Sequence, residues 1–127
     1  MKRSAMLTIA SLLSITFLML HLTDDFIRGI SPVGPWALII LPFVGGWMYA
    51  TLVVAERRSG YFVNLLGGLA ALCMPVLHLR RVWSAVSISK PGTFFFIFTL
   101  LALGALGIFS IIFSVRGLWN PQWGQSK

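Results

Sequence analysis

The residues of this sequence best suited to chemistry are two histidines and two aspartates. His21, Asp24 and Asp25 stand at positions i, i+3 and i+4, so a continuous helix would carry all three on one face. His78 is the second histidine of the chain. Two imidazoles and two carboxylates can bind a divalent metal ion, and two imidazoles alone can ligate a haem iron. The same groups can bind a proton or a small ligand, because imidazole titrates near neutral pH.

The composition places these residues in a membrane protein. Of the 127 residues, 57% are hydrophobic and only 10% are charged, whereas a soluble domain carries about 25% charged residues. The net charge of +7 comes from basic residues at the ends of apolar stretches, which is typical of topology determinants and anionic-lipid contacts. We therefore expect the lipid bilayer as a partner and no nucleic acid. Cys73 is the single cysteine, which excludes an intrachain disulfide and a cysteine-based metal site.

Four apolar stretches are each long enough to cross a hydrocarbon core of about 30 Å, which takes about 20 helical residues. We expect an all-α fold: an integral membrane four-helix transmembrane bundle that forms a single domain over residues 1–127. The basic pair Lys2 and Arg3 followed by an apolar stretch resembles a signal peptide, but no small-residue cleavage site follows, so an uncleaved first span is expected. The expected spans are 5–22, 33–55, 61–79 and 93–115.

The two histidines are expected at the same depth, because each is the centre of a Leu-His-Leu triplet at the end of an odd-numbered span. A weak duplication of a two-helix hairpin would explain the two triplets. Acids follow the first triplet, and Arg80 and Arg81 follow the second, so ion pairs between the hairpins are expected at this membrane face. The alternative to a ligand site is structural, with histidines bonded to loop carbonyls and with acids that cap a helix or pair with arginines.

Basic residues near the span ends favour an orientation with both termini inside. The inner side would carry six of them and the outer side four. The inner set is Lys2, Arg3, Arg57, Arg58, Arg116 and Lys127, and the outer set is Arg28, Arg80, Arg81 and Lys90. The histidine and aspartate residues would then lie at the outer face.

Small residues recur at helical spacing within the spans, and such residues let helices approach closely in lipid. They are expected to pack the bundle or to dock onto another membrane protein or a second copy of the chain. Asn64, one turn into the third span, is expected to form a hydrogen bond between helices. The small residues are Gly46 with Ala50, Gly67 with Ala71, Gly104 with Gly107, and Ser110 with Ser114.

Several segments together resemble a group of small four-span bacterial membrane proteins to which no activity is assigned. The segments are His21–Asp25, Ala55–Tyr61, Pro75–His78, Phe94–Gly104 and Ser114–Trp119. The resemblance implies four spans and a bacterial inner membrane, and it transfers no functional residue.

Two functional hypotheses follow. The first is a non-enzymatic accessory subunit of a larger membrane assembly, which the small size and the small-residue helix faces favour. A phosphate-binding loop, a G-x-S-x-G elbow and a cysteine pair are all missing from the sequence, so it indicates no enzyme. The second is a metal-, haem- or proton-binding membrane protein that uses His21, Asp24, Asp25 and His78. This second hypothesis requires the two imidazoles to lie within about 10 Å of each other.

Overall fold

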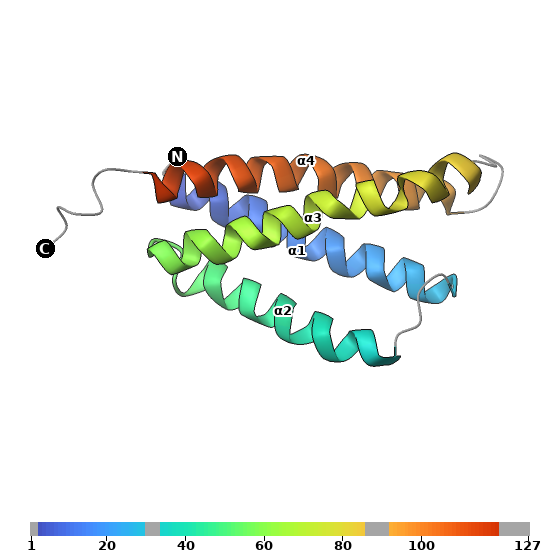
Figure 1. The fold of residues 1–127 in the computed structure, drawn as a ribbon, viewed down its shortest axis with the longest axis horizontal. Helices are drawn as coiled ribbons and strands as arrows, with labels where there is room; N and C mark the ends of the chain where they lie inside the picture. Colours follow the sequence, from blue (N-terminus) through green and yellow to red (C-terminus); the bar gives the residue numbers. More distant parts are fainter. Residues whose placement is uncertain (1–2, 30–33, 86–91, 120–127) are drawn as a thin grey trace, which may run out of the picture.

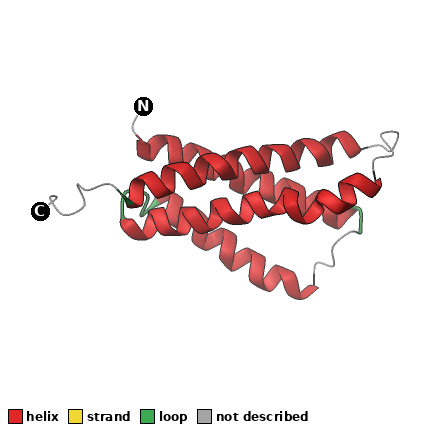
Figure 2. Cartoon of the chain, turned by 45° about the horizontal axis from the view of Figure 1, so that its top comes forward, coloured by secondary structure: helices red, strands yellow, loops and turns green. Residues whose placement is uncertain are grey.

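The structure is a computed structural model that describes residues 3–29, 34–85 and 92–119, with side chains for residues 5–29, 34–79 and 92–119. The described residues form four helices and no strand (Figures 1 and 2). They are α1 (Arg3–Ile27), α2 (Gly34–Leu52), α3 (Arg58–Ala85) and α4 (Thr93–Leu118). All four are long and apolar enough to span a membrane. The expected all-α bundle of four membrane-spanning helices is therefore confirmed.

Helix α1 continues past the end of the first apolar stretch, through Asp24 and Asp25, to Ile27. Gly29 follows the end of the helix by two residues; its φ of +67° is accessible to glycine at little cost, and its backbone N–H donates to the carbonyl of Phe26. Helix α3 likewise continues through Pro75 and beyond His78. Both histidines are therefore on regular helices, which gives their side chains fixed directions.

The bundle is built around α4, which lies along both α3 and α1 (Figure 1). Helix α2 contacts α1 and α3 but diverges from the bundle toward its N-terminal end (Figure 1). Its buried residues are accordingly confined to its second half: Val44, Trp47, Ala50 and Thr51. Trp47 is fully buried and lies in a core with Leu18 of α1 and Leu103 of α4.

A hydrogen-bonded cluster joins α2 to α3 near the turn between them. The indole nitrogen of Trp47 donates to Oδ1 of Asn64 at 3.1 Å, and the hydroxyl of Thr51 lies 2.8 Å from the same oxygen. The amide nitrogen of Asn64 donates to the carbonyl of Gly60. Satisfied polar groups of this kind hold helices together inside lipid, where no water competes. The expected interhelical role of Asn64 is confirmed.

Small residues form close contacts between helices at most of the expected positions. Gly67 lies directly against the indole of Trp47, and a Cβ on Gly107 would come within 2.8 Å of the carbonyl oxygen of Gly68. Ala50 and Ala71 are buried, and Gly104 faces Pro75. Ser110 and Ser114 are also buried.

Gly46 is an exception and corrects the sequence-based expectation. It is exposed, and a Cβ built on it would meet nothing within 4 Å. The reason is that α2 turns the side of Val44, Trp47 and Ala50 toward its neighbours. A small residue at helical spacing contributes to packing only when it lies on that side.

Six of the buried residues of α1 form a series with a heptad-like spacing of four and three residues, and Ala10 and Ile15 are buried beside it. This series places two polar groups of the candidate site, His21 and Asp25, on the same seam as Leu7 and Leu18. Such spacing is typical of helices that pack at a shallow angle. The seam is Leu7, Ser11, Ser14, Leu18, His21 and Asp25.

Candidate functional site

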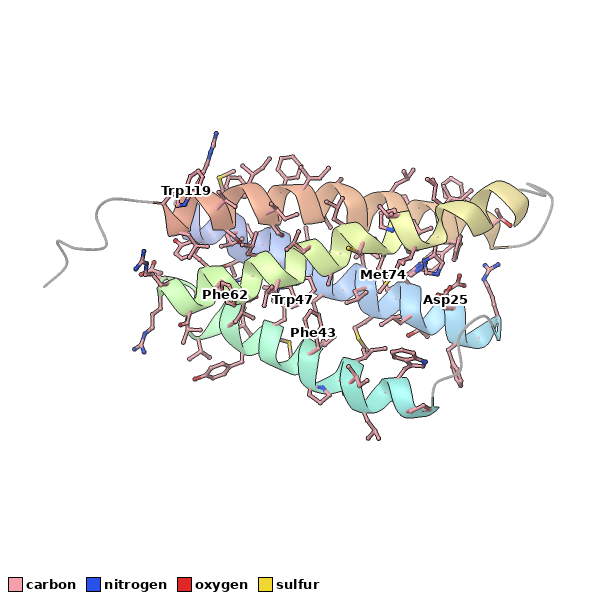
Figure 3. All side chains as sticks on the ribbon, in the orientation of Figure 1. Asp25, Phe43, Trp47, Phe62, Met74 and Trp119 are labelled. Carbon is pink, nitrogen blue, oxygen red and sulfur yellow. The ribbon has the colours of Figure 1, made fainter. Side chains whose placement is uncertain are left out.

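Three helices bring the candidate residues together near one end of the bundle, where α1 ends and α4 begins (Figure 3). His21 and Asp25 come from α1 and His78 from α3. His21 is fully buried, Asp25 is 3% exposed, and the side chain of His78 is 14% exposed. The ring of Phe96 on α4 covers both imidazoles, with centroid distances of 5.0 Å to His21 and 5.7 Å to His78.

The three side chains converge on one small volume. Oδ2 of Asp25 lies 3.1 Å from Nε2 of His78 and 3.8 Å from Nε2 of His21. The two imidazole rings meet edge to face, with centroids 5.0 Å apart and planes at 85°. One ligand atom from each of the three residues lies within 4.8 Å of the others. The two histidines, which the sequence places only at the same depth, therefore meet in the structure.

Hydrogen bonds fix which ring nitrogen of each histidine carries a proton. Nδ1 of His78 lies 3.0 Å from the carbonyl oxygen of Met74, which can only accept, so this nitrogen donates its N–H. Nδ1 of His21 lies 3.1 Å from the hydroxyl of Thr99. The hydroxyl of Thr99 already donates to the carbonyl of Phe96 at 2.9 Å, so it accepts from His21. In their neutral forms both histidines therefore direct an Nε2 lone pair toward Asp25.

The site has more acceptor capacity than its protein donors satisfy. A single proton between Oδ2 of Asp25 and Nε2 of His78 makes one hydrogen bond. Within the described residues, Nε2 of His21 and Oδ1 of Asp25 are buried and have no hydrogen-bond partner. A buried polar atom left in this state costs about 1–3 kcal/mol. Two lone-pair nitrogens and a carboxylate facing one another form an arrangement that a cation would stabilise.

Asp24 does not join this cluster, which corrects the expectation that it shares a face with the other three residues. Its carboxylate instead accepts a hydrogen bond at 2.8 Å from Nε of Arg28, the residue that directly follows α1. Both side chains of this pair are partly exposed. The physical reason is that Asp25, and not Asp24, continues the buried seam of α1. The side chains of Arg80 and Arg81 lie outside the described residues, so the expected pairs with them stay predictions.

The sequence did not point to Thr99, Phe96 or Met74, although all three contact the histidines. Met74 acts through its backbone carbonyl, which any residue would supply. Thr99 is one of four hydroxyl residues in α4, so its hydroxyl alone is not a specific signal. Only the packing of α4 against α1 shows that it faces His21.

The ring contacts also decide between the ligand classes considered from the sequence. A haem held by two axial imidazoles lies between them with its iron at the centre. Here the rings of His21 and His78 are in edge-to-face contact, and Phe96 covers both. The contact between the two rings leaves no space between them for a porphyrin, whereas a single ion with Zn–N bonds of about 2.0–2.1 Å needs only three ligand atoms that lie close together, as they do here within 4.8 Å of one another.

Comparison with protein-family models, with curated proteins and with solved structures gave no match. The class of protein is therefore defined by the fold and the site only. It is a multi-pass, all-helical membrane protein with a cluster of two histidines and one aspartate inside the bundle. The chemistry of that cluster is the feature of the molecule that indicates a function.

Proposed function

We propose that this protein binds a divalent transition-metal ion within the membrane bundle, through Nε2 of His21, Nε2 of His78 and the carboxylate of Asp25. The observation that carries the proposal is the direction of the lone pairs. Both imidazoles donate their Nδ1–H to a protein oxygen and turn Nε2 toward one buried carboxylate. Histidines that bind metals almost always donate the other ring N–H in this way, which fixes the tautomer and the ring orientation.

The donor set favours a particular class of ion. Mg²⁺ and Ca²⁺ prefer oxygen ligands, and soft ions such as Cu⁺ prefer thiolates and thioethers. Two imidazoles and one carboxylate suit Zn²⁺ and its neighbours in the first transition row. Three protein ligands leave at least one coordination position for water or another ligand, as in zinc sites that exchange or activate a ligand. We therefore assign Zn²⁺ or a similar ion to the site.

Metal content of the purified protein tests this proposal. The protein is purified in mild detergent, loaded with Zn²⁺, dialysed and assayed for metal per chain. The key comparison is Asp25→Asn with Asp24→Asn, because these adjacent aspartates differ in whether they face the histidines. We expect one metal ion per chain in the wild type and in Asp24→Asn.

Loss of a residue that only hydrogen-bonds to a metal ligand weakens metal binding roughly 10- to 100-fold. Asp25→Asn and His78→Ala remove a ligand itself, so each should weaken Zn²⁺ binding by more than that. Equal Zn²⁺ affinity in the two aspartate variants, or no stoichiometric metal in the wild type, would overturn the proposal. Helical content and elution volume, measured on each variant, separate loss of metal from loss of fold.

The hypothesis of an accessory subunit is compatible with metal binding and stays a second proposal. It is supported by the first half of α2, which diverges from the bundle and exposes large apolar side chains (Figure 1). Those side chains include Trp36, Leu38, Ile39 and Leu41. A membrane protein that co-purifies in stoichiometric amount, and that is lost when Leu38 and Leu41 are changed to alanine, would support it.

Location in a bacterial inner membrane, with both termini inside, also belongs to the proposal. Its support is the resemblance to four-span bacterial proteins and the excess of Lys and Arg on the side of the chain ends. In this orientation the metal site lies toward the outer face. Reporter fusions at Lys127 and in the 86–91 segment test this orientation, and a C-terminal reporter that is active only outside the cell would reverse it.

A further inference from the structure

Two hollows flank the first turns of α1 at the end of the bundle opposite the histidines. The larger, of about 720 Å³, lies between α1 and the α2–α3 turn, and its polar lining residues are Thr8, Thr51, Glu56 and Arg57. The smaller, of about 210 Å³, lies between α1 and α4 and has apolar walls that include Leu13, Phe109 and Phe113. Ile9 lines both hollows. A ligand that occupies both must be polar at one end and apolar at the other.

The charges at this end of the bundle select an anionic ligand. Arg57, Arg58 and Arg116 all lie here, where α2 meets α3 and where α4 ends (Figure 1). Glu56 is the one acid at this end within the described part of the chain, and it lines the same hollow as Arg57, so the three arginines outnumber it at this end of the bundle. Basic side chains near a membrane surface attract anionic headgroups, each by about 1 kcal/mol. Of these arginines, Arg57 lines the larger hollow.

We infer that one anionic phospholipid binds here, with its phosphate headgroup beside Arg57 and an acyl chain across Ile9 in the apolar hollow between α1 and α4. The inference is independent of the metal site, which lies at the other end of the bundle. The lipid would contact α1, α4 and the turn that joins α2 to α3. It would therefore bridge α2, which diverges from the bundle toward its N-terminal end, to the α1–α4 pair.

Lipid binding is tested on the intact, delipidated protein in detergent. Phosphatidylglycerol and phosphatidylcholine are added in parallel, and lipid adducts are counted by native mass spectrometry. We expect one phosphatidylglycerol per chain at concentrations where phosphatidylcholine does not bind. Arg57→Gln should weaken this binding about fivefold, since about 1 kcal/mol corresponds to that factor. The matched control is Arg116→Gln, which removes the same charge at the same end but outside the hollow.

Ile9→Trp provides a second, steric test, because Ile9 lines both hollows and a larger ring there reduces the space for an acyl chain. Its control is Leu20→Trp, at an exposed position on the same helix. Loss of the lipid adduct in Ile9→Trp alone would support the inference. Equal weakening by Arg57→Gln and Arg116→Gln would show general surface attraction and would overturn it. Equal binding of both lipids, or displacement of phosphatidylglycerol by equimolar inorganic phosphate, would also overturn it.

Discussion

The hydroxyl of Thr99 positions His21, and its removal gives the sharpest quantitative prediction. Thr99→Val keeps the shape of the side chain but removes the acceptor of the His21 Nδ1–H, which lies 3.1 Å away in a fully buried environment. A buried donor without a partner costs about 1–3 kcal/mol of folding free energy. Freed from this bond, the imidazole can also rotate or change tautomer, so Zn²⁺ affinity should fall about 10- to 100-fold.

Competition with a chromophoric chelator measures the affinity, and thermal unfolding in detergent measures the stability. Thr99→Ser should restore most of the affinity, because it restores the hydroxyl. The matched control is Thr16→Val, whose hydroxyl bonds only to the Leu12 carbonyl of its own helix at an exposed position. If Thr99→Val binds Zn²⁺ as tightly as Thr16→Val, the hydrogen-bond argument for the orientation of His21 is wrong.

Three glycine substitutions test the helix packing and the backbone conformation of the bundle. Gly67→Ala should destabilise the protein by about 1–3 kcal/mol, because its Cβ would overlap the indole of Trp47. Gly46→Ala places its Cβ in open space and should be neutral or stabilising by up to about 1 kcal/mol. Equal melting temperatures for Gly67→Ala and Gly46→Ala would refute the contact between Gly67 of α3 and Trp47 of α2. Gly92→Ala should cost at least about 1–2 kcal/mol, since Gly92 has φ +84° and lies against the Arg28 guanidinium. Thermal unfolding that matches the wild type would contradict this last expectation.

The helices could be predicted from the sequence because their cause is local. Each span is a long apolar stretch, and in lipid such a stretch satisfies its backbone only as a helix. Pro42 and Pro75 do not end α2 and α3. The two Leu-His-Leu triplets predict that His21 and His78 lie at the same depth in the membrane. They do not predict the distance between the two imidazoles. Distance depends on which sides of α1 and α3 face each other.

The errors at Asp24 and Gly46 share one physical origin. Spacing places residues on a side of a helix, but it does not show which side packs. Asp24 and Asp25 are about 100° apart around α1, and only Asp25 continues the seam that starts at Leu7. The four-three spacing through Leu7, Ser11 and Ser14 to His21 and Asp25 is present in the sequence, but the series Ala10, Ser14, Phe17, His21 and Asp24 has the same spacing, so the sequence alone does not select the aspartate. Nor does it identify the partner of His21 on α4.

The central claim is that one ion is bound directly by two imidazoles and a carboxylate. X-ray absorption at the zinc edge of the Zn²⁺-loaded protein tests it most directly, because imidazole ligands give a recognisable outer-shell scattering pattern. The account predicts nitrogen and oxygen ligands at about 2.0–2.2 Å, with the scattering of two imidazoles in the wild type and of one in His78→Ala. A spectrum without imidazole scattering, or one unchanged by His78→Ala, would contradict the account.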